Sequence, residues 1–276
     1  MIAGPNGSGK STLIAALRAD SRFDVPALYI NADDLQRERN FRDPREAQQL
    51  ANALRSQAIA KRQDVMYETV MSHPSKIAEL QSAKKAGYHI TVLLVATDHP
   101  NINVQRVAVR VAAGGHDVPE DRTRSRYTRT LALAPVAIGY ADQAFIFDNT
   151  HGGETGGGLS QQAGLMGDRL VASSNTTAAW VVRLIEQVNE RADELNTWDS
   201  PQLAWLHDNC MSGEIVFIGK YCVSQVAINE ENNAEFKMLA QTFVIHDLSL
   251  LGSFAERLVK GQVINIRYHE GVASVE

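Results

Sequence analysis

The chain has few of the residues that build disulfide-rich, metal-binding or membrane-spanning proteins. Its 276 residues include two cysteines, Cys210 and Cys222, and neither stands in a spacing typical of zinc sites. Two cysteines make no disulfide framework, so we expect both to be small buried side chains in a reducing cytoplasm. No apolar run reaches the roughly 18 residues that a membrane span needs, and no signal-peptide pattern opens the chain. The sequence therefore predicts a cytoplasmic protein without a membrane partner.

Positive charge is scarce in the second half of the chain. Residues 151–276 carry 8 Lys and Arg against 16 Asp and Glu, a net charge of −8. Residues 1–150 carry 19 against 16, a net charge of +3, and the two halves sum to the −5 of the whole chain. Nucleic-acid binding depends on cations that neutralise phosphates, so the acidic half disfavours a nucleic-acid partner. The basic half suits a smaller phosphate-bearing ligand.

A complete phosphate-binding loop lies near the start of the sequence. Residues 4–12 read Gly-Pro-Asn-Gly-Ser-Gly-Lys-Ser-Thr and match the pattern G-x-x-x-x-G-K-[ST]. Its glycines let the backbone aim N–H groups at phosphates, while Lys10 is expected to reach the β- and γ-phosphates and Ser11 to bind Mg²⁺. The nucleotide-binding residues predicted here are Gly4, Pro5, Asn6, Gly7, Ser8, Gly9, Lys10, Ser11 and Thr12.

Short apolar segments alternate with helical patterns through residues 1–150. Strands are predicted at Met1–Ala3, Ala27–Asn31, Val65–Thr69, His89–Ala96 and Gln143–Asp148. Helices are predicted at Ser11–Ala19, Arg45–Arg62, Ser75–Ala86, Asn101–Ala113 and Pro119–Tyr140. This alternation predicts a three-layer α/β domain with a mostly parallel sheet and a ligand site at the carboxyl ends of the strands. The first strand is short, since a usual strand has about five or six residues.

The pattern changes after residue 150. Residues 151–175 are rich in glycine and polar residues and predict a flexible linker. Residues 176–276 are expected to form a second unit. It would begin with an amphipathic helix over Thr176–Asn196 and continue, from Ser212, as a small β-rich domain.

Carboxylates follow two of the predicted strands. Asp33 and Asp34 come after the second strand, where one carboxylate could accept a proton from an attacking hydroxyl and the other could cap the next helix. We assign the functional role to Asp33. Glu68 and Thr69 end the third strand, where they could hydrogen-bond a substrate hydroxyl, and a plain surface position is the alternative.

Six arginines flank the pair Gly114-Gly115, and they are Arg106, Arg110, Arg122, Arg124, Arg126 and Arg129. Two helices joined at glycines are typical of a lid that swings guanidinium groups over a bound triphosphate. We predict phosphate contact for Arg110 and Arg126. A solvated face is the expectation for Arg122, Arg124 and Arg129.

Taken together, AGPNGSGKST, YINADD, YETVMS, RVAVRVAAGGHDVPEDRTRSRY and FIFDN resemble the zeta-toxin family of P-loop kinases. The resemblance covers about residues 1–150 and keeps the order of these segments. It implies an ATP- and Mg²⁺-dependent kinase for a hydroxyl of a nucleotide-linked sugar, UDP-N-acetylglucosamine in characterised members. By the same resemblance, Lys10 and Ser11 serve ATP and Mg²⁺ and Asp33 is the general base. Glu68 and Thr69 then lie on the substrate side, and Arg110 and Arg126 stabilise the transferring phosphoryl group.

The C-terminal segments SGEIVFIG, VIHDLSLL and GQVINIRYHEGVASV are similar to the small domain of KfrB-type plasmid proteins. His246, in the second of them, is expected to be structural, as a lone histidine in a strand commonly is. Two other functions stay open. The chain could phosphorylate another nucleotide or a phosphosugar, or it could be a regulatory NTP-binding module with vestigial catalysis. In either case, residues 176–276 could restrain the kinase in cis, or an antitoxin could bind it.

Overall fold

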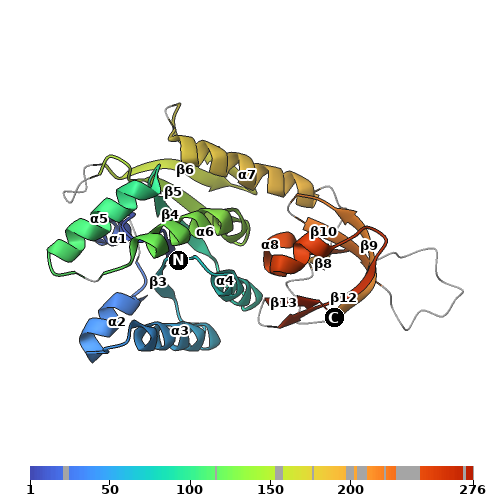
Figure 1. Ribbon diagram of the computed structural model, residues 1–276, viewed down its shortest axis with the longest axis horizontal. Helices are drawn as coiled ribbons and strands as arrows, with labels where there is room; N and C mark the ends of the chain where they lie inside the picture. The colour runs from blue at the N-terminus through green and yellow to red at the C-terminus, as the bar shows by residue number, and fades with distance from the viewer. Residues whose placement is uncertain are drawn as a thin grey trace, which may run out of the picture.

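A computed structural model describes residues 1–20, 25–115, 117–152, 158–175, 177–196, 202–203, 210–220, 222–227, 243–269 and 272–275 (Figure 1). These residues form a seven-stranded sheet in the order β2-β3-β1-β4-β5-β6-β7, with helices packed on it, and a six-stranded sheet near the C-terminus. Strands β1 to β5 pair in parallel. The prediction of an α/β fold with a mostly parallel sheet and a β-rich C-terminal part is therefore confirmed.

The parallel strands have bounds close to those expected, and they are β1 (Ile2–Ala3), β2 (Leu28–Ile30), β3 (Val65–Thr69), β4 (Thr91–Ala96) and β5 (Gln143–Asp148). Alternate side chains of a strand point to opposite faces of the sheet, so β1 and β4 supply both layers of the core. Ile2 and Val95 pack with the α1 residues Leu13, Ile14 and Leu17. Ala3, Leu94 and Ala96 belong to the larger cluster that includes residues of α4, α6 and α7.

The helices of this part are α1 (Lys10–Ala19), α2 (Ala32–Arg39), α3 (Pro44–Ala60), α4 (Ser75–Lys85), α5 (Pro100–Ala112), α6 (Glu120–Gly139) and α7 (Ala179–Asn196). Pro135 lies inside α6, and Gly114, two residues after the end of α5, has a φ of 84° that suits glycine after a helix. The expected start of α7 at Thr176 lies outside the described residues. Trp180, Leu184 and Val188 of α7 are buried, which confirms its amphipathic pattern.

The prediction of a flexible linker over residues 151–175 is wrong for the second half of that segment. Two antiparallel strands, β6 (Ser160–Met166) and β7 (Arg169–Ala172), extend the large sheet there beside β5. Met166 pairs with Arg169, so Gly167 and Asp168 form a two-residue hairpin loop, and the φ of 65° at Gly167 is the conformation such loops need. Glycine in this segment therefore makes a turn between strands.

The C-terminal sheet has the order β13-β12-β9-β10-β11-β8 and lies at the other end of the molecule from α5 (Figure 1). Its elements are β8 (Gln202–Leu203), β9 (Cys210–Ile218), β10 (Cys222–Ala227), β11 (Phe243–Asp247), α8 (Leu248–Leu251), a 3₁₀ helix (Gly252–Arg257), β12 (Val263–His269) and β13 (Val272–Val275). His246 is fully buried, with Nε2 at 2.9 Å from Gln225 Oε1, and burial lowers its pKa to about 4. It is a neutral structural residue, as expected.

Candidate nucleotide and phosphoryl-transfer site

The phosphate-binding loop connects β1 to α1 and requires its glycines. Gly7 and Gly9 have φ values of 74° and 101°, which side chains rarely adopt. A Cβ on Gly9 would lie 2.1 Å from Asn149 Nδ2, and one on Gly4 would lie 2.2 Å from the carbonyl oxygen of Val95. Asn149 Nδ2 also donates to the Ser8 carbonyl at 2.9 Å. The end of β5 therefore holds the loop in shape from behind.

Lys10 begins α1 and is buried, with 7% of its surface exposed. Its Nζ donates to the Pro5 carbonyl at 3.0 Å and lies 3.7 Å from Glu68 Oε1. Burial lowers the pKa of Lys10, and the charge of Glu68 opposes that shift. A nucleotide phosphate would replace Glu68 as the partner of a cation that is already positioned in the loop.

Glu68 at the end of β3 is held by two residues at the end of β2. Tyr29 Oη and Asn31 Nδ2 each donate to Glu68 Oε2 at 3.3 Å. Burial, followed by the charge of Glu68, raises the pKa of Tyr29, so its hydroxyl keeps the proton that it donates. Sequence reasoning placed Glu68 at this rim, and the structure brings it next to Lys10.

Asn31 is the N-cap of α2, and this corrects the sequence-based prediction, which gave the functional role to Asp33 and left the cap to Asp34. Its Oδ1 accepts from the backbone N–H of Asp33 at 2.8 Å. Three residues that could cap a helix, Asn31, Asp33 and Asp34, follow β2 in sequence, and the cap falls on the first of them because β2 ends at Ile30. Both aspartates lie in the first turn of α2. Asp34 pairs with the exposed Arg37, whereas Asp33 lines the same cavity as Lys10.

The cavity has a volume of about 920 Å³ and extends from the phosphate-binding loop to α3 and the start of α4. The predicted site residues that line it are Asn6, Gly7, Gly9, Lys10, Ser11, Thr12, Asp33, Glu68, Thr69, Arg110 and Arg126. Gly4, Pro5 and Ser8 complete the loop and are buried. Residues predicted from four separate segments thus meet around one space.

Four arginines of α5 and α6 also line the cavity, and they are Arg106, Arg110, Arg122 and Arg126. Arg126 Nη1 already donates to Asn6 Oδ1 of the loop at 3.1 Å, and burial lowers its pKa. Arg122 lies one helical turn before Arg126 and lines the cavity, and it is exposed, as expected for a solvated face. Arg124, by contrast, donates to Glu120 Oε1 and Asn101 Oδ1, and Arg129 is exposed, as predicted.

Arg106 was not assigned a role from sequence. Its Nη2 donates to the carbonyl oxygens of Asn149, at 2.8 Å, and Thr150, at 3.3 Å, and to that of Gly152. Its Nη1 is buried without a hydrogen-bond partner among the described residues. One nitrogen of the guanidinium group therefore ties α5 to the segment after β5, and the other remains a donor for a ligand. Its position one turn before Arg110 was the only sequence signal.

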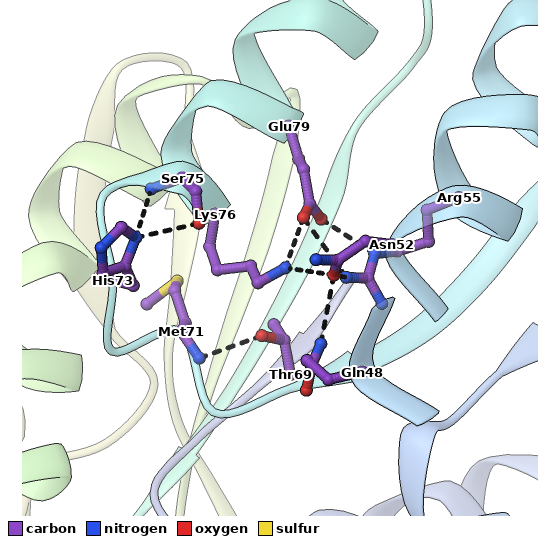
Figure 2. A network of polar contacts seen from close by, with 9 residues as sticks. All are labelled: Gln48, Asn52, Arg55, Thr69, Met71, His73, Ser75, Lys76 and Glu79. Atoms are coloured by element: carbon purple, nitrogen blue, oxygen red, sulfur yellow. Dashed lines mark hydrogen bonds and ion pairs between the residues drawn. The ribbon is translucent and has the colours of Figure 1, made fainter. Parts of the chain in front are cut away.

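The far part of the cavity is lined by Gln48 and Asn52 of α3 and by Thr69, His73 and Lys76 around the segment between β3 and α4 (Figure 2). We call this part the α3–α4 end. Sequence reasoning found Thr69 here and missed the other four. The sequence gives little indication of these four residues, because α3 and α4 come together only in the tertiary structure.

The segment after β3 has an unusual backbone. Met71 is fully buried and adopts a φ of 52°, which is uncommon for a residue with a side chain. Thr69 Oγ1 accepts from the N–H of Met71 at 3.0 Å, and Thr130 Oγ1 of α6 donates to the Val70 carbonyl at 2.7 Å. Strain of this kind persists where surrounding contacts enforce it, commonly at ligand sites. Thr69 therefore fixes the wall of the cavity as well as facing it.

The described ranges contain neither a metal-binding cluster of side chains nor a membrane-spanning helix. No group of three or more His, Cys, Asp or Glu side chains there could hold a metal ion by itself. No helix among those residues is both long and apolar enough to cross a bilayer.

Part of the chain is similar in sequence to known proteins. The Zeta toxin family model matches residues 1–133. An uncharacterized protein of Haemophilus influenzae is 31% identical over 128 residues, which are 45% of this chain and 88% of that protein. The KfrB-like similarity of the C-terminal segments lies outside the family match and stays a prediction.

Two solved structures are similar to part of this chain. The PezAT chromosomal toxin–antitoxin system of Streptococcus pneumoniae matches with a TM-score of 0.40 and 15% identity, over 71% of this chain and 87% of that one. A proposed kinase from Chloroflexus aurantiacus matches with a TM-score of 0.36 and 16% identity, over 47% of this chain and 76% of that one.

Proposed function

We propose that the chain, whose residues 1–133 match the Zeta toxin family model, transfers the γ-phosphoryl group of ATP to a hydroxyl of a nucleotide-linked sugar, UDP-N-acetylglucosamine first among them. The observation that carries the proposal is the single cavity in which a complete phosphate-binding loop faces Asp33, Arg110 and Arg126. A loop that only bound a nucleotide would need neither a carboxylate nor a further pair of arginines opposite its lysine.

Lys10 would bind the β- and γ-phosphates once they displace Glu68, and Arg126 is already in contact with the loop through Asn6. Arg110 lines the same cavity close to the glycine pair where α5 ends. Because negative charge spreads over the transferring phosphoryl oxygens in the transition state, these cations would stabilise it more than the ground state.

Mg²⁺ is the expected cofactor, and the residues present fit it. The hydroxyl of Ser11 and the carboxylate of Asp33 both line the cavity and are the hard oxygen donors that this ion prefers. Bound together with ATP, the ion would neutralise phosphate charge. Asp33 is also the group that would accept the proton of the acceptor hydroxyl, while Glu68 and Thr69 would hold the acceptor.

A protein partner is a further proposal. The acidic C-terminal part has a net charge of −8 over residues 151–276, whereas the cavity rim carries arginines. The described C-terminal strands lie at the other end of the molecule from α5 (Figure 1), so a separate antitoxin suits the restraining role better than these strands do.

Phosphoryl transfer from labelled ATP to a panel of UDP-sugars tests the proposed function. Asp33→Asn keeps the size of the side chain and removes the base, so transfer should fall by roughly 10²- to 10⁴-fold while ATP still binds. Asp34→Asn is the matched control, because Asp34 pairs with exposed Arg37 and should retain most of the activity. Full activity of Asp33→Asn, or no transfer by the parent protein to any acceptor, would refute the mechanism.

A further inference from the structure

The α3–α4 end of the cavity has more positive than negative charge. Arg55 and Lys76 are buried, with 1% and 9% of their surfaces exposed, and both contact the carboxylate of Glu79 (Figure 2). Arg55 engages both carboxylate oxygens, through Nε at 2.9 Å and Nη2 at 3.3 Å. Tyr67, under the Arg55 guanidinium at 5.0 Å, stays neutral because burial raises its pKa. Two cations thus share one anion, which leaves one positive charge in excess.

Hydrogen-bond donors are in excess as well. Asn52 Oδ1 accepts from Gln48 Nε2 at 3.1 Å, from Lys76 Nζ at 3.0 Å and from Arg55 Nη2. An amide oxygen has two lone pairs, so three donors overload it. Lys76 has three N–H groups and two acceptors, Asn52 and Glu79, among the described residues. Lysine side chains are rarely buried to this degree.

The donors that face the cavity here belong to side chains. The backbone N–H groups of Lys76 and Ile77, in the first turn of α4, bond to the carbonyl oxygens of His73 and Pro74 at 3.0 and 2.9 Å. The start of α4 therefore offers a ligand little through its backbone. Lys76 and Gln48 line the cavity, while Arg55 and Glu79 stand behind them.

We propose that the α3–α4 end binds a phosphate group of the acceptor, with Lys76 Nζ and the Gln48 side-chain amide as its donors. The proposal rests on the proposed function, since the acceptor must share the cavity with ATP. A phosphate there uses the third N–H of Lys76, relieves the overloaded oxygen of Asn52 and balances the excess charge. Lys76 then selects phosphate-bearing acceptors over neutral sugars, and Asp33 and Glu68 face the sugar between the two phosphate sites.

Binding to the full chain, with the phosphate-binding loop saturated by the non-hydrolysable ATP analogue AMPPNP and Mg²⁺, tests this site without any turnover. UDP-N-acetylglucosamine, N-acetylglucosamine 1-phosphate and N-acetylglucosamine are titrated by calorimetry. We expect Lys76→Gln to weaken the two phosphate-bearing ligands by roughly 10- to 100-fold, the usual effect of losing a charged hydrogen bond. N-acetylglucosamine, which has no phosphate, should bind the parent protein and the Lys76→Gln variant with equal affinity. The two phosphate-bearing ligands distinguish a diphosphate from a monophosphate site.

Two controls separate recognition from stability. Lys84→Gln removes an exposed lysine of the same helix, paired with Asp142, and should leave all three affinities unchanged. Lys76→Gln should keep the parent melting temperature, because Arg55 and Glu79 remain a balanced pair. A lowered melting temperature with unchanged phosphate affinity would make Lys76 a structural residue and overturn the proposal, as would a loaded parent protein that binds neither phosphate-bearing ligand. Intact phosphate binding without phosphoryl transfer would instead refute the proposed function alone.

Discussion

Glu79→Gln probes how the buried charges beside the cavity are balanced. The Glu79 carboxylate is the anionic partner of Arg55 and Lys76, whose side chains are only 2% and 11% exposed, and it is itself 18% exposed. Glutamine has nearly the same size but no charge. The variant would therefore leave the cations of Arg55 and Lys76 next to each other in a poorly hydrated environment. Repulsion replaces attraction there, while the packing of α3 against α4 changes little.

The expected loss of stability is large for a single substitution. Removing one partner of a buried ion pair costs about 3–5 kcal/mol. In a chain of this size, each kcal/mol shifts the melting temperature by about 2–4 °C. We therefore expect Glu79→Gln to melt roughly 6–20 °C below the parent protein. Lys84→Gln breaks an ion pair whose side chains are 38% and 31% exposed, and should cost at most about 1 kcal/mol.

The loss should also depend on pH, and its sign follows from Lys76. Burial lowers the pKa of Lys76 from its ordinary 10.5, and Glu79 opposes that shift, so the variant lowers this pKa further. Between the folded and the unfolded pKa, the folded state binds fewer protons than the unfolded state, so stability rises with pH in that window. The destabilisation by Glu79→Gln should therefore be largest near pH 7 and shrink as the pH approaches 10.

Thermal unfolding followed by circular dichroism at pH 7 and pH 9.5 measures both effects in the parent and the two variants. A Glu79→Gln protein that melts within about 2 °C of Lys84→Gln at pH 7 would mean that the charges near Arg55 are well hydrated. A difference that does not change with pH would show that Lys76 keeps its proton without Glu79. Either result would refute the charge balance from which the phosphate site is inferred.

Two further predictions concern the phosphate-binding loop and the arginines. Lys10→Ala should abolish phosphoryl transfer, because the transferring group loses its only cation from the loop. If the variant turned over ATP at the parent rate in a steady-state assay, the loop would be excluded as the catalytic site. Arg110→Ala and Arg126→Ala should each lower kcat more than they raise KM for ATP. Arg124→Ala is the control, because Arg124 bonds to Glu120 and Asn101, and equal kinetics in all three variants would place Arg110 and Arg126 on a solvated face.

Local sequence patterns were sufficient for the strands and helices that surround the loop. β3 (Val65–Thr69) and β5 (Gln143–Asp148) have the predicted bounds, because in each strand polar residues flank a short apolar run on both sides. The carboxyl ends of parallel strands share one edge of the sheet, so the approach of Asp33 and Glu68 to Lys10 also followed from the order of the elements. The order of the elements did not determine which of Asn31, Asp33 and Asp34 caps α2.

The hairpin of β6 and β7 was missed for a different reason. Its glycine content indicated a linker, although Gly167-Asp168 between apolar residues is a turn signal as well. Local composition supports both interpretations, and the choice depends on the partner strand. β6 pairs with β5, which lies at the edge of the parallel sheet until β6 covers it.

The residues of the α3–α4 end could not be assigned from sequence because Lys76 and Glu79 look like an ordinary surface pair. They stand three residues apart on one helix, a spacing typical of exposed ion pairs. Only the fold brings Arg55, which is 24 residues from Glu79 in sequence, against the same carboxylate. The short-range spacing alone therefore does not indicate the excess of positive charge that the tertiary structure leaves.

Lys10 and Lys76, at the two ends of the cavity, differ in the interaction that must break when a ligand binds. Lys10 shares Glu68 with no second cation in ion-pair contact among the described residues, so a nucleotide phosphate must displace a carboxylate that Tyr29 and Asn31 continue to hold. Lys76 shares Glu79 with Arg55, so a phosphate can bind there while the carboxylate keeps Arg55 as its partner. Because displacing an anion opposes binding and neutralising an excess cation favours it, the α3–α4 end can bind a phosphate whether or not ATP is present.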